Sequence, residues 1–440
     1  MKRSSLLALG LGAALLIAIY VADIAIGPGA AAGLSQSDLA LISGVIEVVQ
    51  KDYVHPIAED RLTQDALKGM LSRLDPHSAY MDEQEFREVR DEMSGKFGGV
   101  GVEIEDQSGI PTVISPIDGT PAANAGLQPG DRIVAVDGKG TNGMDAAQVV
   151  NIVRGKPGSP VTLTISRAAE KPFDVTLNRS IIQVRTVIWK LQPNGIGYVR
   201  ISEFGKDTPR DLKQAVAGLK QKAGGKLKGL VLDLRNDPGG LLKSAVEVSK
   251  EFLDSGTIVS IRGRRHSDDQ IYKASARGDV LPGTPIAILI NGASASASEI
   301  VTGALQDHHR ATVMGTRSFG KGSVQSIVAL NGHGALRLTT ALYYTPSGRS
   351  IQGEGIAPDV VVEPPKDQQA NSSPLLRESL LHGAFTNPGS LTNASASENP
   401  NAHREEYSAP IKSELIGTPQ DAQLKAALGY LERSTGEPRS

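Results

Sequence analysis

A short serine-rich stretch is the first place where this sequence could do chemistry. The segment NGASASASE, residues 291–299, places three serines between alanines. It follows the apolar run PIAILI and precedes IVTGALQD, whose apolar residues have helical spacing, so a strand should turn into a helix here. The start of a helix offers free N–H groups and a positive dipole end, which suit a developing oxyanion. A serine here could therefore be a nucleophile, while a plain helix start of small residues is the alternative.

A serine nucleophile needs a base, and the histidines do not supply one. The nearest pair, His308 and His309, begins 12 residues after Ser296 in the same predicted helix, which is roughly 18 Å along its axis. The other histidines have no triad-like surroundings, and GASAS lacks the second glycine of the G-x-S-x-G elbow. The base must therefore be another type of residue.

Lysine is the alternative base, and Lys321 in RSFGKGSVQ is the candidate. Gly320 and Gly322 place no bulk beside its amine and allow close backbone approach. A lysine base must be neutral, so its pKa must fall several units below about 10.4, as burial without a partner carboxylate achieves. A fall of about three units corresponds to about 4 kcal/mol, so the site must exclude water. The alternative is a solvated loop lysine.

The composition limits the other classes of function. With 40% hydrophobic and 21% charged residues, the 440-residue chain is typical of a globular protein of about two to three domains. Its formal net charge of -2 predicts no nucleic acid partner. The sequence has no cysteine, which excludes cysteine nucleophiles, disulfides and thiolate metal sites. We expect neither a metal nor a cofactor.

The N-terminal residues 1–32 predict export. A basic head, MKRSS, precedes a 17-residue apolar run, and small residues follow as far as an Ala-x-Ala pattern at residues 30–32. This order is typical of a signal peptide, and the run is only slightly short for a membrane anchor. In either case we expect the bulk of the chain in the periplasm or on the extracytoplasmic face of the cytoplasmic membrane. A retained anchor would associate the protein with the inner membrane.

The pattern after this leader predicts an α+β protein of several parts. Helical spacing dominates residues 33–97, and short strands broken by glycine and proline dominate residues 98–180. Strands and helices alternate over residues 181–365. Residues 366–440 read as a polar linker with a C-terminal helical tail.

The segment of residues 98–180 resembles a PDZ domain. The resemblance rests on FGGVGVEI, SPIDGTPAANAGLQPGDRIVAVDG and VVNIVRGKPGSPVTLTISR. PDZ domains bind extended peptides, often C-terminal ones, by adding them as a strand to a sheet edge. The resemblance implies a peptide-binding loop, whereas the glycines alone would suggest a tight turn. The residues of this predicted loop are Gly98, Gly99, Val100, Gly101 and Val102.

Four motifs together resemble the C-terminal processing (tail-specific) peptidases, over residues 34–365. They are LDPHSAYMDEQEF, GLVLDLRNDPGG, NGASASASEIVTGALQD and GTRSFGKGSVQ. The resemblance implies a Ser–Lys endopeptidase with a mixed α/β core of the ClpP/crotonase-like type.

The resemblance assigns the catalytic roles. Ser296 would be the nucleophile, Lys321, 25 residues later, the general base, and Gln325 the residue that orients the lysine. A neutral amide can do this without raising the pKa of the amine. In a straight strand Lys321 and Gln325 would be about 13 Å apart, so we expect a bend, at Gly322.

The oxyanion donors are expected to be the N–H groups of Ala297 and of either Gly239 or Gly240, between which spacing does not choose. The chain departs from the family at Ala293, where glycine is usual, and at Asp237, where asparagine is common. Asp237 should add a charge near the oxyanion.

Three further residues receive secondary roles. Ser294 and Ser298 are lesser candidates for the nucleophile, and Asp307 matches a recurrent family position that we interpret as structural. Arg154 resembles a family arginine linked to switching between inactive and active states, with an ordinary surface arginine as the alternative.

The resulting prediction is an exported serine endopeptidase that cleaves proteins near or from their C-termini. Its PDZ domain would catch an apolar substrate C-terminus and raise the effective concentration of the upstream chain at Ser296. An adaptor protein and a homo-oligomer are left open as further partners. The alternative function is a non-catalytic PDZ scaffold with a decayed hydrolase domain.

Overall fold

The structure is a computed structural model, and it describes residues 17–19, 35–93, 96–107, 109–117, 119–167, 170–183, 185–370, 377–388 and 411–434. The predicted signal or anchor, residues 1–32, lies outside the described residues except for 17–19. Within these ranges, no helix combines the length and the apolar character needed to cross a membrane. The described chain forms two compact units, one containing residues 89–185 and the other residues 13–88 with 186–440.

The smaller unit is the strand-rich module expected from the sequence. Five antiparallel strands run in the order β4-β5-β6-β8-β9, with β7 on β6, and β3 pairs with β10. Its core contains Val113, Ile133 and Leu163. The elements are β3 (Lys96–Gly99), β4 (Val102–Gln107), β5 (Ile110–Pro116), α4 (Pro121–Asn124), β6 (Arg132–Val136), β7 (Lys139–Gly140), α5 (Ala146–Val153), β8 (Pro160–Ser166), β9 (Phe173–Asn178) and β10 (Ser180–Gln183).

Three helices precede the strand-rich module and agree with the predicted helical region. They are α1 (Gln36–Asp52), α2 (Glu59–Leu71) and α3 (Glu83–Met93). The side chain of Ser35 caps the start of α1 by accepting the N–H of Asp38. None of the residues of α1 is buried. The short strand β2 (Ala79–Met81) follows α2 and pairs with β19.

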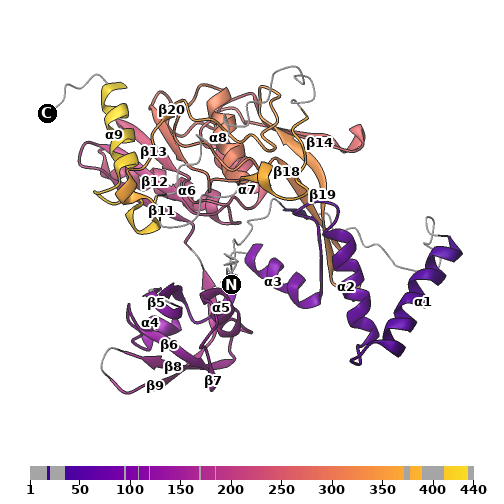
Figure 1. The fold of residues 1–440 in the computed structure, drawn as a ribbon. Helices are drawn as coiled ribbons and strands as arrows, with labels where there is room; N and C mark the ends of the chain where they lie inside the picture. Colours follow the sequence, from indigo (N-terminus) through magenta and orange to yellow (C-terminus); the bar gives the residue numbers. More distant parts are fainter. Residues whose placement is uncertain are drawn as a thin grey trace. The chain divides into compact units, whose positions relative to one another are not determined.

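The main sheet of the larger unit runs β11-β12-β13-β16-β17-β20 (Figure 1). All neighbours after the β11–β12 pair are parallel, so the carboxyl ends of β13 and β16 reach the same edge. Both of these strands are buried along their whole length, as expected for a sheet covered on two faces. The strands are β11 (Val187–Leu191), β12 (Ile196–Ile201), β13 (Gly229–Asp233), β16 (Ile286–Ile290), β17 (Thr312–Gly315) and β20 (Val360–Val361).

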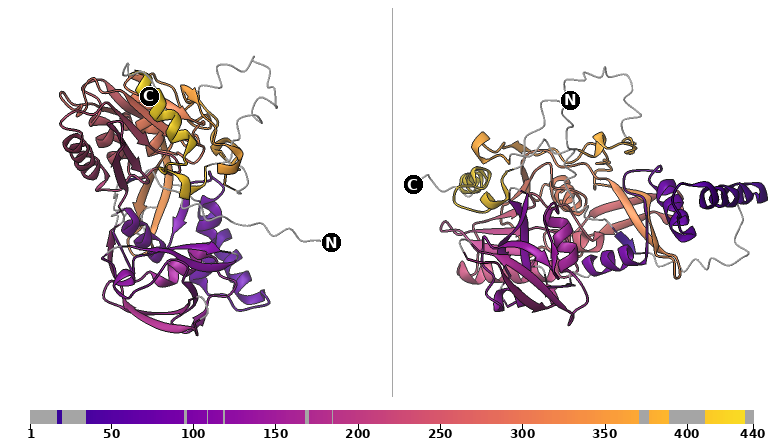
Figure 2. Two further views of the ribbon diagram at one scale, coloured as in Figure 1. Left: turned by 90° about the vertical axis from the view of Figure 1, so that its left-hand side faces the viewer. Right: turned by 60° about the horizontal axis from the view of Figure 1, so that its bottom comes forward.

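A second sheet carries the segment that follows Lys321. Its order is β1-β18-β19-β14-β15, with β2 beside β19. The long β18–β19 hairpin is drawn in orange in Figures 1 and 2. The strands are β1 (Ile17–Ile19), β14 (Thr257–Gly263), β15 (Gln270–Lys273), β18 (Ser323–Ala329) and β19 (Ala335–Tyr344).

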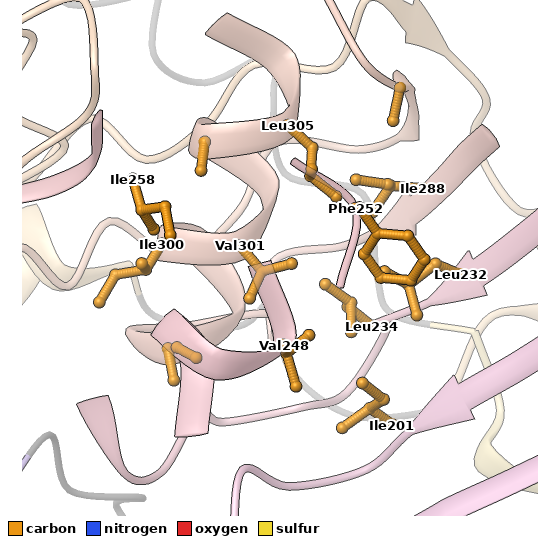
Figure 3. Packing of buried hydrophobic residues seen from close by; sticks show 14 of the residues in the cluster. Ile201, Leu232, Leu234, Val248, Phe252, Ile258, Ile288, Ile300, Val301 and Leu305 are labelled. Atoms are coloured by element: carbon orange, nitrogen blue, oxygen red, sulfur yellow. The ribbon is translucent and has the colours of Figure 1, made fainter. Parts of the chain in front are cut away.

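Helices cover both faces of the main sheet. On one face α6 (Thr208–Lys222), α7 (Leu242–Lys250) and α8 (Ala297–Asp307) pack on side chains such as Leu232. Figure 3 shows Val301 and Leu305 of α8 close to Phe252 in this core. Residues Ala297 to Leu305 of α8 are buried on every side, as expected of a central helix.

The other face is covered by the C-terminal helix α9 (Ala422–Ser434). Its residues Leu424, Ala427 and Leu431 pack with Val231 and Leu289, which point away from the first core. The predicted helix in this part of the tail is therefore present. Among the described residues of the segment LLRESLLHG, from which a short helix is also expected, there is the 3-10 turn η3 (Glu378–Leu380). Further 3-10 turns among the described residues are η1 (His266–Asp268), η2 (Lys366–Gln368) and η5 (Ser413–Leu415).

The single tryptophan of the chain lies in the larger unit. Trp189 on β11 packs against Gly218 of α6, where an added Cβ would come within 2.8 Å of the indole ring. The amine of Lys222 lies 4.8 Å from the ring centroid.

Candidate active site

Ser296 stands at the junction between the loop after β16 and helix α8. Its backbone has φ of 62° and ψ of -112°, a conformation that an L-residue adopts only under constraint and that is frequent at functional sites. The side chain is fully buried, and its Oγ has no hydrogen-bond partner in the described residues. Burying an unpaired hydroxyl costs about 1–3 kcal/mol. A buried hydroxyl without a partner is therefore a candidate for a catalytic role.

The neighbouring serines are engaged in the fold. Ser294 Oγ accepts the N–H of Asn291 at 2.9 Å and donates to the carbonyl of Leu234 at 2.7 Å. Ser298 Oγ donates to the carbonyl of Asp237 at 3.0 Å. Both hydroxyls join the segment after β16 to the loop after β13, so neither is as free to react as that of Ser296.

Lys321 is buried, with only 4% of its surface exposed. It follows Gly320, whose φ of 97° gives the loop its turn. Burial lowers the pKa of the Lys321 amine from its ordinary value near 10.5 to about 8, against the opposing effect of the Glu378 carboxylate. This is the dry environment that a lysine base requires.

Two side chains bring the backbones of Ser296 and Lys321 together. Glu299 Oε2 accepts the N–H of Ser296 at 2.7 Å and that of Lys321 at 2.9 Å. On the carbonyl side, the hydroxyl of Tyr343 donates to Ser296 O at 3.3 Å and contacts Lys321 O as well. The two residues are 25 positions apart in the sequence but share the same partners. We call Ser296, Glu299, Lys321, Gln325 and Tyr343 the Ser296 cluster.

Glu299 is a residue of this site that the sequence did not single out. Its other oxygen, Oε1, accepts the hydroxyl of Ser318 at 2.5 Å and the N–H of Gly320 at 2.7 Å. Burial raises the pKa of Glu299 to about 7, although these donors act to lower it. The only signal in the sequence was its place three residues after Ser296, at the start of the helix.

Gln325 is buried with one end of its amide fixed and the other free. Its Nε2 donates to Ser323 Oγ at 3.0 Å and to Thr339 Oγ1 at 3.2 Å. Thr339 in turn donates to Asp75 of the LDPHS motif at 3.0 Å. The Oε1 of Gln325 has no partner in the part of the chain that the structure describes, and no hydrogen bond joins it to the Lys321 amine there.

The strand that carries Gln325 is irregular close to that residue. The register between β18 and β19 shifts between Val324 and Gln325, which marks a β-bulge. Gly322, where we expected a bend, lies directly before β18, and a Cβ there would come within 2.6 Å of the backbone nitrogen of Gln352.

Gly239, in the loop after β13, lies directly against Ser296. A Cβ on Gly239, whose φ is 107°, would come within 2.8 Å of Ser296 Cβ and 2.9 Å of the nitrogen of Ala297. The Gly239 N–H donates to Asp237 Oδ1 at 2.8 Å. The N–H groups of Gly240 and Ala297 have no acceptor among the described residues. This arrangement leaves those two N–H groups available for an oxyanion.

The surroundings of Asp237 disfavour the charge that the sequence led us to expect there. The side chain is fully buried, and its Oδ2 has no partner in the described residues. Burial raises the pKa of Asp237 well above its ordinary value, which favours the protonated carboxyl. A sequence motif does not reveal burial, and the charge expected here assumed a solvated carboxylate. The neutral acid has the size of the asparagine common in the family.

Comparison with known proteins identifies the family. Residues 195–362 match peptidase family S41, residues 112–167 match a PDZ domain, and residues 27–85 match the activating protease CtpB N-terminal domain. A carboxy-terminal-processing protease of Bartonella bacilliformis is 49% identical over 348 residues, covering 78% of this chain and 80% of that protein. The chain belongs to peptidase family S41. It is therefore a serine-type peptidase of the carboxy-terminal-processing kind.

More distant relatives of this S41 peptidase have similar names. A probable CtpA-like serine protease of Staphylococcus aureus (strain COL) is 38% identical over 340 residues, covering 77% of this chain and 68% of that protein. Among solved structures, a photosystem II D1 C-terminal processing protease has 30% identity and a TM-score of 0.46, covering 75% of this chain and 94% of that chain.

The PDZ unit of the S41 peptidase has an open sheet edge next to the predicted peptide-binding loop. Strand β4 ends the sheet and pairs only with β5 among the described strands. The loop before it contains the N–H groups of Val100 and Gly101, which have no acceptor in the described residues. Gly98 packs against the carbonyl of Gly155, so there is no room for a side chain at this position. Gly99 closes β3, and Val102 begins β4.

Two residues with expected secondary roles belong to different units, Asp307 to the larger unit and Arg154 to the PDZ unit. Asp307 at the end of α8 accepts the N–H of Ser347 at 2.9 Å and pairs with Arg349 at 3.6 Å. His308 contacts the carbonyl of Thr257 at 2.7 Å. Arg154 follows α5 in the PDZ unit, where its N–H donates to the carbonyl of Val150. Asp307 thus has structural contacts, as interpreted from the sequence.

Proposed function

We propose that this S41 peptidase is an exported endopeptidase in which Ser296 and Lys321 form the catalytic pair. The observation that carries the proposal is an unpaired, buried Ser296 hydroxyl whose backbone shares Glu299 and Tyr343 with a buried lysine of lowered pKa. A nucleophile and a neutral base need this proximity and this dryness.

In the proposed mechanism the neutral Lys321 amine takes the proton of Ser296 while Oγ attacks the peptide carbonyl. The negative oxygen of the tetrahedral intermediate accepts the N–H groups of Ala297 and Gly240. The lysine ammonium then returns the proton to the leaving amine, and an acyl-enzyme forms. Water, deprotonated by the same amine, hydrolyses the ester and regenerates Ser296.

Gln325 is proposed to direct the lysine. Because its Nε2 is held by Ser323 and Thr339, its free Oε1 is the end that can accept a hydrogen bond from the Lys321 amine. A neutral acceptor orients the amine without favouring its protonated form.

The PDZ unit is proposed to bind the C-terminal end of a protein substrate. An extended peptide would add to the open edge of β4, with its carboxylate at the N–H groups of Val100 and Gly101. We expect an apolar C-terminal side chain. Arg154 is proposed to take part in switching between inactive and active states.

Export and assembly are further parts of the proposal. The leader pattern of residues 1–32 supports a periplasmic or extracytoplasmic location, with either a cleaved signal or a retained inner-membrane anchor. Helix α1 exposes apolar side chains, including Leu41 at 66% and Val48 at 59%. Such a helix is typical of one that packs against another chain, either a second copy or an adaptor protein.

The decisive test is cleavage of a protein with an apolar C-terminal tag by the purified wild type, Ser296→Ala and Lys321→Ala proteins. The proposal expects cleavage only by the wild type. Cleavage at wild-type rate by both variants would refute the catalytic pair. Absence of cleavage by all three, with the tag still bound, would favour the alternative, a non-catalytic PDZ scaffold.

A further inference from the structure

A second buried polar cluster lies just before the loop that carries Gly240. Its centre is Arg235, which is fully buried two residues after the end of β13. All five guanidinium N–H groups are used. Two bond to Asp233 at 2.9 and 2.6 Å, two to Asp421 at 3.0 and 2.6 Å, and one to Gln423 at 3.0 Å. We call Tyr198, Asp233, Arg235, Asp421 and Gln423 the Arg235 cluster.

Asp421 reaches this cluster from a distant part of the sequence. It lies 186 residues after Arg235, directly before α9, and is fully buried. Its own oxygens also accept the N–H groups of Gly417 at 3.0 Å and Leu424 at 3.0 Å. The carboxylate is therefore fixed to its own helix while it holds the guanidinium.

The Arg235–Asp421 ion pair is not needed to hold α9 on the sheet. Leu424, Ala427 and Leu431 already bury the apolar side of α9 against the sheet. A buried ion pair adds little net stability compared with apolar packing, because both charges lose their water. What it does add is a fixed position for the groups that it joins.

The residues that follow Arg235 in the chain contact the loop that carries Ser296. The next residue, Asn236, has a φ of 55°, and its N–H donates to Asn291 Oδ1 at 3.0 Å. Its Nδ2 donates to Ser413 Oγ at 3.2 Å, a second contact with the C-terminal segment. The carbonyl of Asp237 then accepts the N–H of Ala295 at 3.0 Å. Loop 236–240 is thus held between the C-terminal segment and the Ser296 loop.

We propose that Asp421 is a positioning residue for catalysis. By fixing Arg235 it sets where loop 236–240 lies, and so aligns the Gly240 N–H with that of Ala297. The described C-terminal segment, residues 411–434, then belongs to the apparatus that forms the oxyanion site. This inference rests on the proposed function of Ser296 and of these two N–H groups.

The test compares full-length Asp421→Asn and Asp421→Ala with Leu219→Ala, all at a temperature where each is folded. Leu219 is a buried residue of α6 on the opposite face of the sheet, so its variant matches the loss of stability without touching the Arg235 cluster. We expect kcat of both Asp421 variants to fall about hundredfold, as for a misplacement of about 1 Å, while KM changes little. The Leu219 variant should keep the kcat of the wild type.

A second measurement separates positioning from general loosening. A peptide aldehyde forms a tetrahedral adduct with a serine, whose oxyanion needs the two N–H donors. Its affinity should fall in parallel with kcat in the Asp421 variants, while an apolar C-terminal peptide binds the PDZ unit as before. Wild-type kcat in both Asp421 variants, or an equal loss in Leu219→Ala, would overturn the inference. If Ser296→Ala were also active, the proposed function would fail with it.

Discussion

The two buried polar clusters on either side of loop 236–240 differ in how completely their atoms are paired. In the Arg235 cluster every guanidinium N–H has an acceptor, and Tyr198 donates to Asp233 at 2.9 Å. In the Ser296 cluster the Ser296 hydroxyl and the Oε1 of Gln325 have no partner in the described residues. The first cluster holds charges, and the second encloses a lysine that burial drives toward neutrality.

This difference separates support from reactivity. A fully paired buried cluster has a single low-energy arrangement and is rigid. An unpaired buried hydroxyl or amide oxygen costs free energy, and it is retained where a substrate or a catalytic group will occupy it. The structure thus places a rigid cluster next to an incomplete one, with the Gly239–Gly240 turn between them.

Replacing Lys321 with methionine should have the largest effect on this contrast. The base is lost, so kcat should fall about 10⁴-fold. At pH 7 the free energy of unfolding should rise by about 1–3 kcal/mol, because a charge no longer has to be buried. Peptide hydrolysis and urea denaturation measure the two effects. The exposed Lys425, changed to methionine, is the matched control and should alter neither.

Glu299→Gln should have the next largest effect. Glu299 is the fully paired member of the Ser296 cluster, and an amide would turn N–H groups toward two of its four donors. We expect about a hundredfold loss of kcat and a lower melting temperature, because Ser296 and Lys321 lose their common anchor. Exposed Glu414→Gln is the control. A change confined to KM would show that Glu299 does not position the pair.

The pH dependence tests the lysine directly. Burial lowers the pKa of Lys321 to about 8, and only the neutral amine can accept a proton. Raising the pH deprotonates it, so kcat should rise about tenfold per pH unit below pH 8 and level off above it. A rate already constant from pH 6 to 8 would contradict a lysine base with this pKa.

Asp237→Asn should have the smallest effect, and it acts on stability. Because burial raises the pKa of Asp237, folding favours its protonated form, and stability should fall as pH rises above the ordinary pKa near 3.8. The nearby charges of Glu203 and Arg200 have smaller effects on this carboxyl. The variant should abolish this fall in stability between pH 5 and 8, because an amide does not ionise. The free energy of unfolding is measured by urea denaturation at both pH values. An equal change between pH 5 and 8 in the wild type and the variant would disprove this.

The sequence was informative wherever the signal was local. The strand before Ser296, the helix after it and the glycines around Lys321 all lie within a few residues of the groups that they serve. The strand-rich module and the C-terminal helix could also be predicted, because their periodicities are contained in single segments. These features depend on neighbours in the chain, which a sequence displays.

Features that depend on distant partners could not be predicted. Glu299 looks like an ordinary helix-start residue until Lys321 is seen at its carboxylate, and Asp421 has no visible role until α9 is docked. The bulge at Val324 and Gln325 depends on register with β19. The raised pKa of Asp237 depends on its burial, which the residues beside it in the sequence do not show.

The single tryptophan gives the two units separate spectroscopic identities. The indole ring of Trp189 on β11 packs against α6, so its fluorescence reports the environment of the larger unit. Because the chain has one tryptophan, the PDZ unit contributes no indole emission. Loss of the contacts with Gly218 and Lys222 should shift the emission when the larger unit melts. Circular dichroism records both units. A denaturation followed by both signals can therefore reveal whether the peptidase core and the peptide-binding unit unfold together or one after the other.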